Sequence, residues 1–151
     1  MARYGAKASK GAAVVKTVLG LHVAAASPRR IRVFEWEFGS DAAAIIDQQV
    51  THIAQRATTV PTGAALVPNA NDPADTIAST AQAFDTVTVD GTLTANAFLK
   101  GIALNMRNSF RWQAYDRVAE LIIPATANNG IAFGISAGQA SSYAHDALWD
   151  E

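Results

Sequence analysis

The sequence predicts an all-β fold, an antiparallel β-sandwich that is jelly-roll-like, with an extended N-terminal arm and one long crossover loop. Seven or eight short segments alternate apolar and polar residues with the period of two that marks a half-buried strand. Turn-forming residues separate these segments, and none has a convincing amphipathic helix period. With 151 residues, half of them hydrophobic, the chain is long enough for one core and too short for two. Sequence alone does not separate a jelly roll from other sandwich topologies.

The chain opens with residues 1–12, which are rich in Gly, Ala, Lys and Ser and are predicted to form an arm that the fold does not need. Residues 13–151 are assigned to a single β-sandwich domain. Its first predicted strand has β-branched content and a glycine, Gly20, which favour a strand over a helix. The alternating positions are Val15, Thr17, Leu19, Leu21 and Val23.

The firmest strand is RRIRVFEWEFG at residues 29–39. Phe34, Trp36 and Phe38 fall on one face of this strand, and the intervening glutamates fall on the other. Three aromatic side chains on one face predict that this face is buried. The next segment, 44–57, has apolar residues at both parities, so it is either one strand or a short helix at 41–48 followed by a strand.

Residues 55–75, QRATTVPTGAALVPNANDPAD, contain three prolines and have no strand or helix period. The cluster from Asn69 to Asp75 carries the oxygen ligands that hard cations prefer. It lacks the acid spacing, the central glycine and the closing glutamate of an EF-hand, whereas Asp72 and Pro73 are typical of a turn. We therefore expect an ordered crossover loop between two halves of the domain, with turn chemistry favoured over metal binding.

Four further segments complete the predicted sandwich. The Asp90-Gly91 turn follows the alternating DTVTV, and SFRWQAY at 109–115 repeats the first aromatic pattern, with Phe110 and Trp112 predicted to be buried. Residues 118–138 are predicted to form two strands around the Asn128-Asn129-Gly130 turn, and SSYAHDALWDE forms a final strand. The glycines spaced four apart after this turn, Gly130, Gly134 and Gly138, are expected where another group comes close to the backbone.

The charges are balanced in total but not along the chain. Twelve basic residues stand against 13 acidic ones, so there is no reason to expect nucleic-acid binding, and no apolar run reaches the ~18 residues of a membrane span. Seven basic residues and no acidic one precede Glu35, whereas the chain ends on Asp146, Asp150 and Glu151. This asymmetry predicts electrostatic complementarity between copies or with a partner. The alternative is a solvated basic arm without a specific role.

The sequence contains no motif of an enzyme. There is no cysteine, no Gly-x-Ser-x-Gly elbow and no phosphate-binding Gly-rich loop. The three histidines, His22, His52 and His145, are far apart, and we expect them at the rim of the sandwich. We therefore expect a protein without catalytic activity, cofactor or metal.

The ordered set of these segments resembles a family of small structural proteins encoded among the head genes of tailed bacteriophages. Proteins of this family commonly act as capsid decoration, or cement, subunits. The matching segments are MARY, SPRRIRVFEWEFG, QRAT, NDPAD, ALNMRNSFRWQA and ELIIPATANNGIAFGISA, followed by a short acidic tail with an aromatic residue. Each segment alone is a strand or a turn, and the resemblance lies in their order, which covers most of the chain.

The resemblance implies a jelly-roll-like subunit that oligomerises, as a homotrimer or else a dimer, on the outer surface of a head made of a separate major capsid protein. It implies synthesis in the host cytoplasm, a final location in the virion and no catalytic residue. Arms and long loops suit this role because they order on contact with a neighbour. The expected capsid or subunit contacts are therefore Arg3, Tyr4, Lys7, Lys10, Pro68, Asn71, Asp72 and Asp75.

Two alternatives are kept open. The protein could be a tail or head-to-tail connector component of the same virion. It could also be a carbohydrate-binding jelly-roll module, which needs an exposed aromatic platform. Because Trp36 and Trp112 are predicted to be buried, only Trp149 and Tyr143 are candidates for such a platform.

Overall fold

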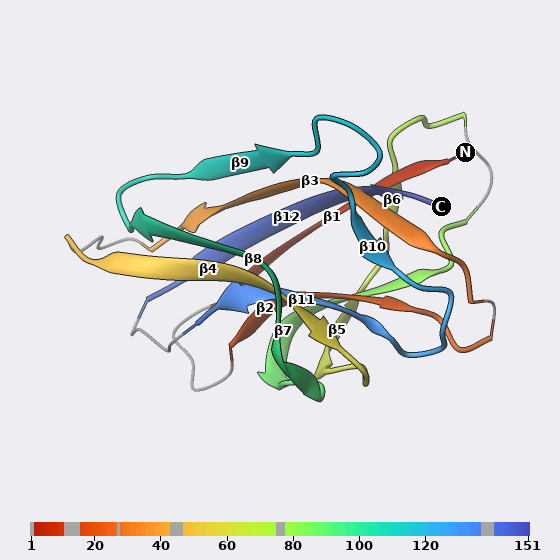
Figure 1. Ribbon diagram of the computed structural model, residues 1–151, viewed down its shortest axis with the longest axis horizontal. Coiled ribbons are helices and arrows are strands. Elements are labelled where there is room, and N and C mark those ends of the chain that lie inside the picture. Colours follow the sequence, from red (N-terminus) through yellow and green to blue (C-terminus); the bar gives the residue numbers. More distant parts are fainter. Residues whose placement is uncertain (1, 11–15, 27, 43–46, 75–77, 137–140) are drawn as a thin grey trace.

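The computed structural model describes residues 2–151 apart from 11–15, 27, 43–46, 75–77 and 137–140. The described residues form twelve strands and no helix, arranged as two six-stranded antiparallel sheets packed face to face (Figure 1). The predicted antiparallel β-sandwich is thereby confirmed, with more strands than the seven or eight expected. No helix among these residues has the length and apolar character needed to cross a membrane.

Each sheet has one edge-to-edge order. The first sheet runs β10-β3-β12-β1-β6, with β9 also paired to β3, and the second runs β5-β7-β2-β11-β4-β8. The strands of the first sheet are β1 (Arg3–Lys10), β3 (Ile31–Ser40), β6 (Asn69–Ala70), β9 (Phe110–Gln113), β10 (Leu121–Ile123) and β12 (Tyr143–Asp150). Those of the second sheet are β2 (Thr17–Val23), β4 (Gln49–Ala57), β5 (Thr62–Leu66), β7 (Ala81–Val89), β8 (Leu93–Asn105) and β11 (Gly130–Ile135).

The expected N-terminal arm is a strand of the sandwich. Residues 3–10 form β1, which lies between β12 and β6 and pairs with β12 over its whole length (Figure 1). The sequence signal for this strand is the alternation of Tyr4, Ala6 and Ala8, which are all buried. The prediction of a dispensable arm is therefore wrong, because removing residues 1–12 would take an interior strand out of the first sheet.

The expected long loop at 55–75 contains strand residues as well. It begins with the end of β4, continues as β5 in the second sheet and crosses to β6 in the first sheet. Between β4 and β5, Pro61 is buried against β2, where a Cβ added to Gly20 would lie 2.9 Å from Pro61 Cγ. The segment is an ordered crossover between the two sheets, as expected, but short strands with few side chains in the core left no clear period in its sequence.

The aromatic strand β3 changes face in its middle. Ile31 and Val33 are buried before this point, Trp36 and Phe38 are buried after it, and Phe34 is only half-buried. The register with β12 shifts here, since Leu148 lies opposite Glu35 and Trp149 lies opposite Val33. Such a β-bulge inserts one extra residue and reverses the sides that follow. The prediction that all three aromatic residues share a buried face is therefore wrong for Phe34.

The segment 44–57 contributes β4, and the predicted helix at 41–48 falls partly outside the described residues.

The prediction for the three glycines spaced four apart, that another group lies close to the backbone, is confirmed at two of the three positions. A Cβ at Gly130 would lie 2.4 Å from the Leu21 carbonyl oxygen, and one at Gly134 would lie 2.0 Å from the Lys16 carbonyl oxygen. Gly138 lies outside the described residues.

The core fills the space between the sheets with large aromatic and aliphatic side chains. Trp36 lies at its centre, with ring centroids 4.1 Å from Phe38 and 5.4 Å from Phe133 of the opposite sheet. Trp149 is fully buried beside Tyr4. The expectation that Trp149 and Tyr143 are candidates for exposure is wrong, because both belong to the inward face of β12.

Candidate functional site

The structure brings part of the expected contact set together, because β6 pairs with the start of β1 and places Asn71 beside Arg3. Tyr4 is buried in the core and is not available to a partner. Lys10 is half-buried, and its ammonium donates to the Thr17 carbonyl oxygen at 3.3 Å. Arg3 and Lys7 are exposed on the outer face of the first sheet. Of the four N-terminal residues predicted to make contacts, Arg3 and Lys7 therefore remain available to a partner, and both lie on a strand rather than on an arm.

Three of the other four expected residues flank β6, with Pro68 before it and Asn71 and Asp72 after it. Pro68 is half-buried, and Asn71 and Asp72 are exposed. The Asn71 amide donates to the Arg3 carbonyl oxygen, and Asp72 Oδ1 accepts from the Ala74 amide at 2.9 Å. Asp72 therefore makes the predicted turn contact with its own backbone. Asp75 lies outside the described residues.

The basic front and the acidic tail meet within one molecule. The pairing of β1 with β12 places Arg3 opposite Asp150 and Lys7 opposite Asp146. Arg3 Nε lies 3.2 Å from Asp150 Oδ1, a charge contact without hydrogen-bond geometry. The charge asymmetry of the sequence is thus compensated inside the chain, and the predicted complementarity between copies is not needed to explain it.

Charged side chains form a row across the outer face of the first sheet. The register places Lys7, Asp146, Glu37 and Arg111 side by side on β1, β12, β3 and β9. In the neighbouring row, Glu35 accepts hydrogen bonds from Arg111 Nη2 at 2.7 Å and from Gln113 Nε2 at 2.6 Å. Burial raises the pKa of Glu35, but these two hydrogen bonds and the Arg111 charge outweigh it, so the pKa is lowered.

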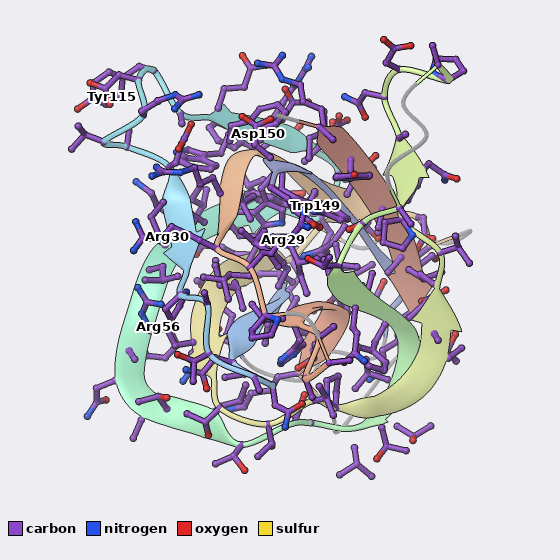
Figure 2. The ribbon with its side chains drawn as sticks, turned by 90° about the vertical axis from the view of Figure 1, so that its right-hand side faces the viewer. Arg29, Arg30, Arg56, Tyr115, Trp149 and Asp150 are labelled. Atoms are coloured by element: carbon purple, nitrogen blue, oxygen red, sulfur yellow. The ribbon has the colours of Figure 1, made fainter. Side chains whose placement is uncertain are left out.

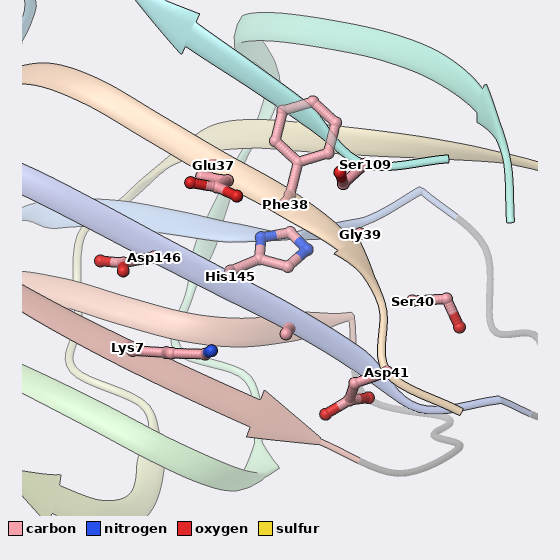
Figure 3. A pocket seen from close by; sticks show the side chains of 10 residues that line it. Lys7, Glu37, Phe38, Gly39, Ser40, Asp41, Ser109, His145 and Asp146 are labelled. Atoms are coloured by element: carbon pink, nitrogen blue, oxygen red, sulfur yellow. The ribbon is translucent and has the colours of Figure 1, made fainter. Parts of the chain in front are cut away.

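A shallow hollow of about 290 Å³ opens at the end of this row (Figure 3). Lys7, Glu37 and Asp146 stand together along it, with Asp41 near the end of β3. Burial raises the pKa of the Asp146 carboxyl and, with the smaller effects of Glu37 and Glu35, outweighs the Lys7 charge, which lowers this pKa. The hollow offers ionic and hydrogen-bonding contacts to a polar group. The described residues nowhere bring together three side chains suited to hold a metal ion.

Glu151 is held by hydrogen bonds to the residues at the start of β7 and does not project as an acidic tail. The Glu151 carboxylate accepts from the Thr80 amide at 2.8 Å, the Thr80 hydroxyl at 2.7 Å and the Ala81 amide at 3.1 Å. It also accepts from Ser79 Oγ and from Trp149 Nε1. Burial raises the pKa of Glu151, and these hydrogen bonds outweigh that effect and lower it.

The histidines are buried rather than at the rim, and two of them are in contact. Trp36 Nε1 donates to His145 Nδ1 at 3.3 Å, and His145 Nε2 lies 3.1 Å from His52 Nδ1. Because the indole can only donate, the His145 proton sits on Nε2 and is donated to His52, so both rings are neutral. Burial lowers the pKa of His52 to about 4 and that of His145 well below its ordinary value. The prediction of rim histidines is wrong.

The most exposed apolar side chains lie mainly on one flank, where β8 and β9 form the free edges of the two sheets. Phe98 on β8 and Phe110 on β9 are 54% and 41% exposed. Beyond β9, Tyr115 projects from the connection to β10 (Figure 2). Tyr115 and Val118 of this connection are both about nine-tenths exposed. Asp116 Oδ1 accepts from the Val118 and Ala119 amides, both at 2.9 Å, which holds this loop in one shape.

The sequence interpretation missed this flank because it placed Phe110 and Trp112 in the core. Trp112 is half-buried, and Lys100 Nζ lies 5.3 Å from the centre of its ring. The signal for the loop was present, since an aspartate two residues before Val118 is typical of a side-chain-capped turn. The histidine pair had no such signal, because 93 residues separate its members.

Comparison with protein-family models, with curated proteins and with solved structures found no match to this chain.

Proposed function

We propose that the protein is a virion structural protein, a capsid decoration subunit that binds the outer surface of a tailed-phage head across capsomer junctions and stabilises the shell. The resemblance of its ordered sequence segments motivates this proposal. The structural observation that carries it is the apolar flank of Phe98, Phe110, Tyr115 and Val118, with its internally braced loop. Exposed aromatic side chains held in one conformation are the usual anchors of protein interfaces.

The strand order supports the jelly-roll-like interpretation. Four strands of the first sheet run β10-β3-β12-β1 and four of the second run β8-β4-β11-β2, so that successive strands of this set alternate between sheets. The exception to this alternation is the step from β4 to β8, which pair with each other in the second sheet. Such an arrangement leaves loops and edges free to vary while the two sheets keep the core. The remaining strands extend the edges of this eight-strand set.

A subunit of this kind acts through repetition rather than chemistry. Its proposed partners are the major capsid protein and copies of itself, with a homotrimer or a dimer as the assembled form. Many weak contacts repeated around a symmetric shell add up through multivalency. The outer face of the first sheet, with Arg3 and Lys7 exposed, provides polar contacts that complement the apolar flank.

The test is reconstitution on heads that lack this subunit. Wild-type protein is expected to sediment with such heads to a fixed occupancy and to raise the temperature at which they release DNA. A Tyr115→Ala, Val118→Ser double variant is expected to bind at least tenfold more weakly with an unchanged melting temperature. Val89→Ser, at a 58% exposed apolar position at the end of β7, is the matched control.

Failure of the wild type to bind heads would overturn the proposal. Electron microscopy of whole particles separates the head from the tail, and density confined to the tail would replace the decoration role with a tail or connector role. The carbohydrate-binding alternative has lost the platform on which it rested, since Trp149 and Tyr143 are core residues. A Trp149→Ala variant therefore tests stability and not glycan binding.

A further inference from the structure

One edge strand of the sandwich differs from all the others. The edges formed by β5, β6, β9 and β10 are two to five residues long, whereas β8 at the edge of the second sheet has 13 residues. Proteins usually protect sheet edges by keeping them short, or with proline, bulges and outward-pointing lysines. β8 contains no proline, and its second half, from Lys100 to Asn105, pairs with β4 without a bulge.

The hydrogen-bonding direction along this half of β8 follows from one contact. The Met106 amide donates to the Gln48 carbonyl oxygen at 2.9 Å, so residue 106 directs its backbone polar groups toward β4. In an antiparallel strand this direction alternates from one residue to the next. Residues 104, 102 and 100 therefore also face β4, and the N–H and C=O groups of Gly101, Ala103 and Asn105 face outward, where the Asn105 carbonyl oxygen already accepts from the Asn108 amide at 3.0 Å. Among the described residues, no strand pairs with that side.

The side chains around this edge leave room for another strand. Gly101 and Ala103 are exposed, and a Cβ placed on Gly101 would have no atom within 4 Å. The one charged side chain of β8, Lys100, points inward over the Trp112 ring and does not guard the edge. Phe110 on β9 is 41% exposed, because the second sheet ends at β8 and no described strand continues that sheet past β8 to cover it.

We propose that β8 is a self-association edge, and that residues 100–105 pair antiparallel with the same strand of a second copy to join two second sheets into one. The outward N–H and C=O groups of Gly101 and Ala103 and the outward N–H of Asn105 define the chemistry of the occupant, since only an extended backbone matches their spacing. A twofold axis makes one strand serve as both donor and acceptor edge.

The strand is self-complementary in the register centred on Ala103. Gly101 then faces Asn105 of the second copy, a small residue opposite a larger one. On the inward face, Ile102 meets Leu104 of the second copy, which forms an apolar cross-strand pair. Lys100 meets Met106 of the second copy, so the two lysines are six residues apart in the joined ladder and do not repel each other.

The exposed aromatic side chains near this edge supply part of the area that a stable dimer buries. A fully exposed aromatic side chain contributes roughly 150–250 Å², so Phe98 and Phe110 together leave roughly 200 Å² uncovered on each copy at their 54% and 41% exposure. The two copies together therefore contribute about one third of the roughly 1,200 Å² that a specific interface buries. The edge backbone and the half-buried Ile102 and Leu104 supply further area from the same surface.

This inference favours a dimer over a trimer for the free protein, and it stands without the proposed head-binding function. Self-association is measured on purified protein, whereas the proposed function is measured on heads. A monomer that still binds heads would sink only the inference, and a dimer that ignores heads would sink only the proposed function.

The experiment compares wild type with Ala103→Pro by sedimentation equilibrium over a hundredfold range of concentration. Proline removes the outward N–H of residue 103 and leaves the hydrogen bonds between β4 and β8 in place. Wild type is expected to dimerise, and Ala103→Pro is expected to dissociate at least tenfold more readily. Ala103→Ser, which keeps the N–H at the same position, is the matched control and is expected to dimerise as wild type.

A second measurement keeps the inference testable if the proline variant fails to fold. In wild type, hydrogen exchange of the Gly101, Ala103 and Asn105 amides is expected to slow as concentration rises, while the already paired Ile102 and Leu104 amides stay slow throughout. A wild type that is monomeric at all concentrations, or a dimer whose three outward amides exchange as fast as in the monomer, would overturn the inference.

Discussion

Two strands with almost the same sequence pattern differ sharply in burial. β3 carries FEWEF and β9 carries FRWQ, and the two strands pair so that Trp36 lies opposite Trp112 and Phe38 lies opposite Phe110. Trp36 and Phe38 are fully buried, whereas Trp112 is half-buried and Phe110 is 41% exposed. The difference comes from position, because β3 also pairs with β12, whereas among the described strands β9 pairs with β3 alone. Alternation therefore reports which face a side chain takes, and the number of neighbouring strands decides how deeply it is buried.

The largest effect is expected at the centre of β3. Trp36→Ala should lower the free energy of unfolding by about 3–5 kcal/mol, because it empties a site bounded by Phe38 and Phe133 and leaves the His145 Nδ1 acceptor without its donor. Chemical denaturation followed by circular dichroism measures this loss. A loss under ~1 kcal/mol would mean that Trp36 is no more deeply buried than Trp112. The contrast in burial between β3 and β9 would then be wrong.

The histidine pair beneath Trp36 makes the same core sensitive to acid. Burial lowers the pKa of His52 to about 4, so the folded state resists the proton that the unfolded chain accepts near pH 6.5. The resulting stability is complete above pH 7 and is lost as pH falls from about 6.5 toward 4. From His52 alone, the free energy of unfolding should fall by about 2 kcal/mol between pH 7.5 and pH 5, and His145 shifts in the same direction.

Urea unfolding at these two pH values checks this prediction. His52→Gln is the matched variant, because its side-chain oxygen can accept from His145 Nε2 without titrating. The variant should lose less stability than wild type between pH 7.5 and pH 5. An identical loss in both proteins would show that the buried pair does not carry the acid sensitivity. Work above pH 5 keeps Glu35, Asp41 and Glu151, whose pKa values are lowered, out of the measurement.

A smaller effect is expected on the edge strand. Trp112→Ala should cost about 1–2 kcal/mol, since only part of its ring is buried and the Lys100 contact adds less than a full hydrophobic site. The measurement is the same denaturation series used for Trp36. A cost equal to that of Trp36→Ala would show that β9 is as much part of the core as β3, which the sequence pattern alone suggested.

The parts of the fold that the sequence predicted well are those with many neighbours. β3, β11 and β12 each pair with strands on both sides, so their buried residues are large and their alternation is strong. β1 also lies between two strands, although β6 pairs with only Tyr4 and Gly5 of it. Its buried residues beside Tyr4 are alanines, which carry little signal and resemble an arm. The bulge at Phe34 needed the partner strand to be known, since a register shift is a property of a pair of strands.

The candidate contact surface was harder to predict than the fold. Exposure of Phe110 and the freedom of the β8 edge depend on where each sheet ends, which is set by contacts between distant segments. In the same way, the pairing of Arg3 with Asp150 turned an apparent attraction between molecules into a contact within one. Local pattern gives the face of a strand, and only the assembled sheets show which strands are left at an edge.

The smallest effect is expected at Lys100, a residue of β8 whose ammonium contacts the Trp112 ring of β9. Lys100→Met keeps an unbranched side chain over the Trp112 ring and removes the charge, so stability should change by less than ~1 kcal/mol. Self-association through the β8 edge should be unchanged, because Lys100 points inward over the Trp112 ring and the two lysines lie six residues apart in the joined ladder. Sedimentation equilibrium and urea unfolding of the same samples separate the two quantities. Weaker association at unchanged stability would show that the ammonium contributes to the interface, and it would place the contact on the Trp112 side of the flank instead of the β8 edge.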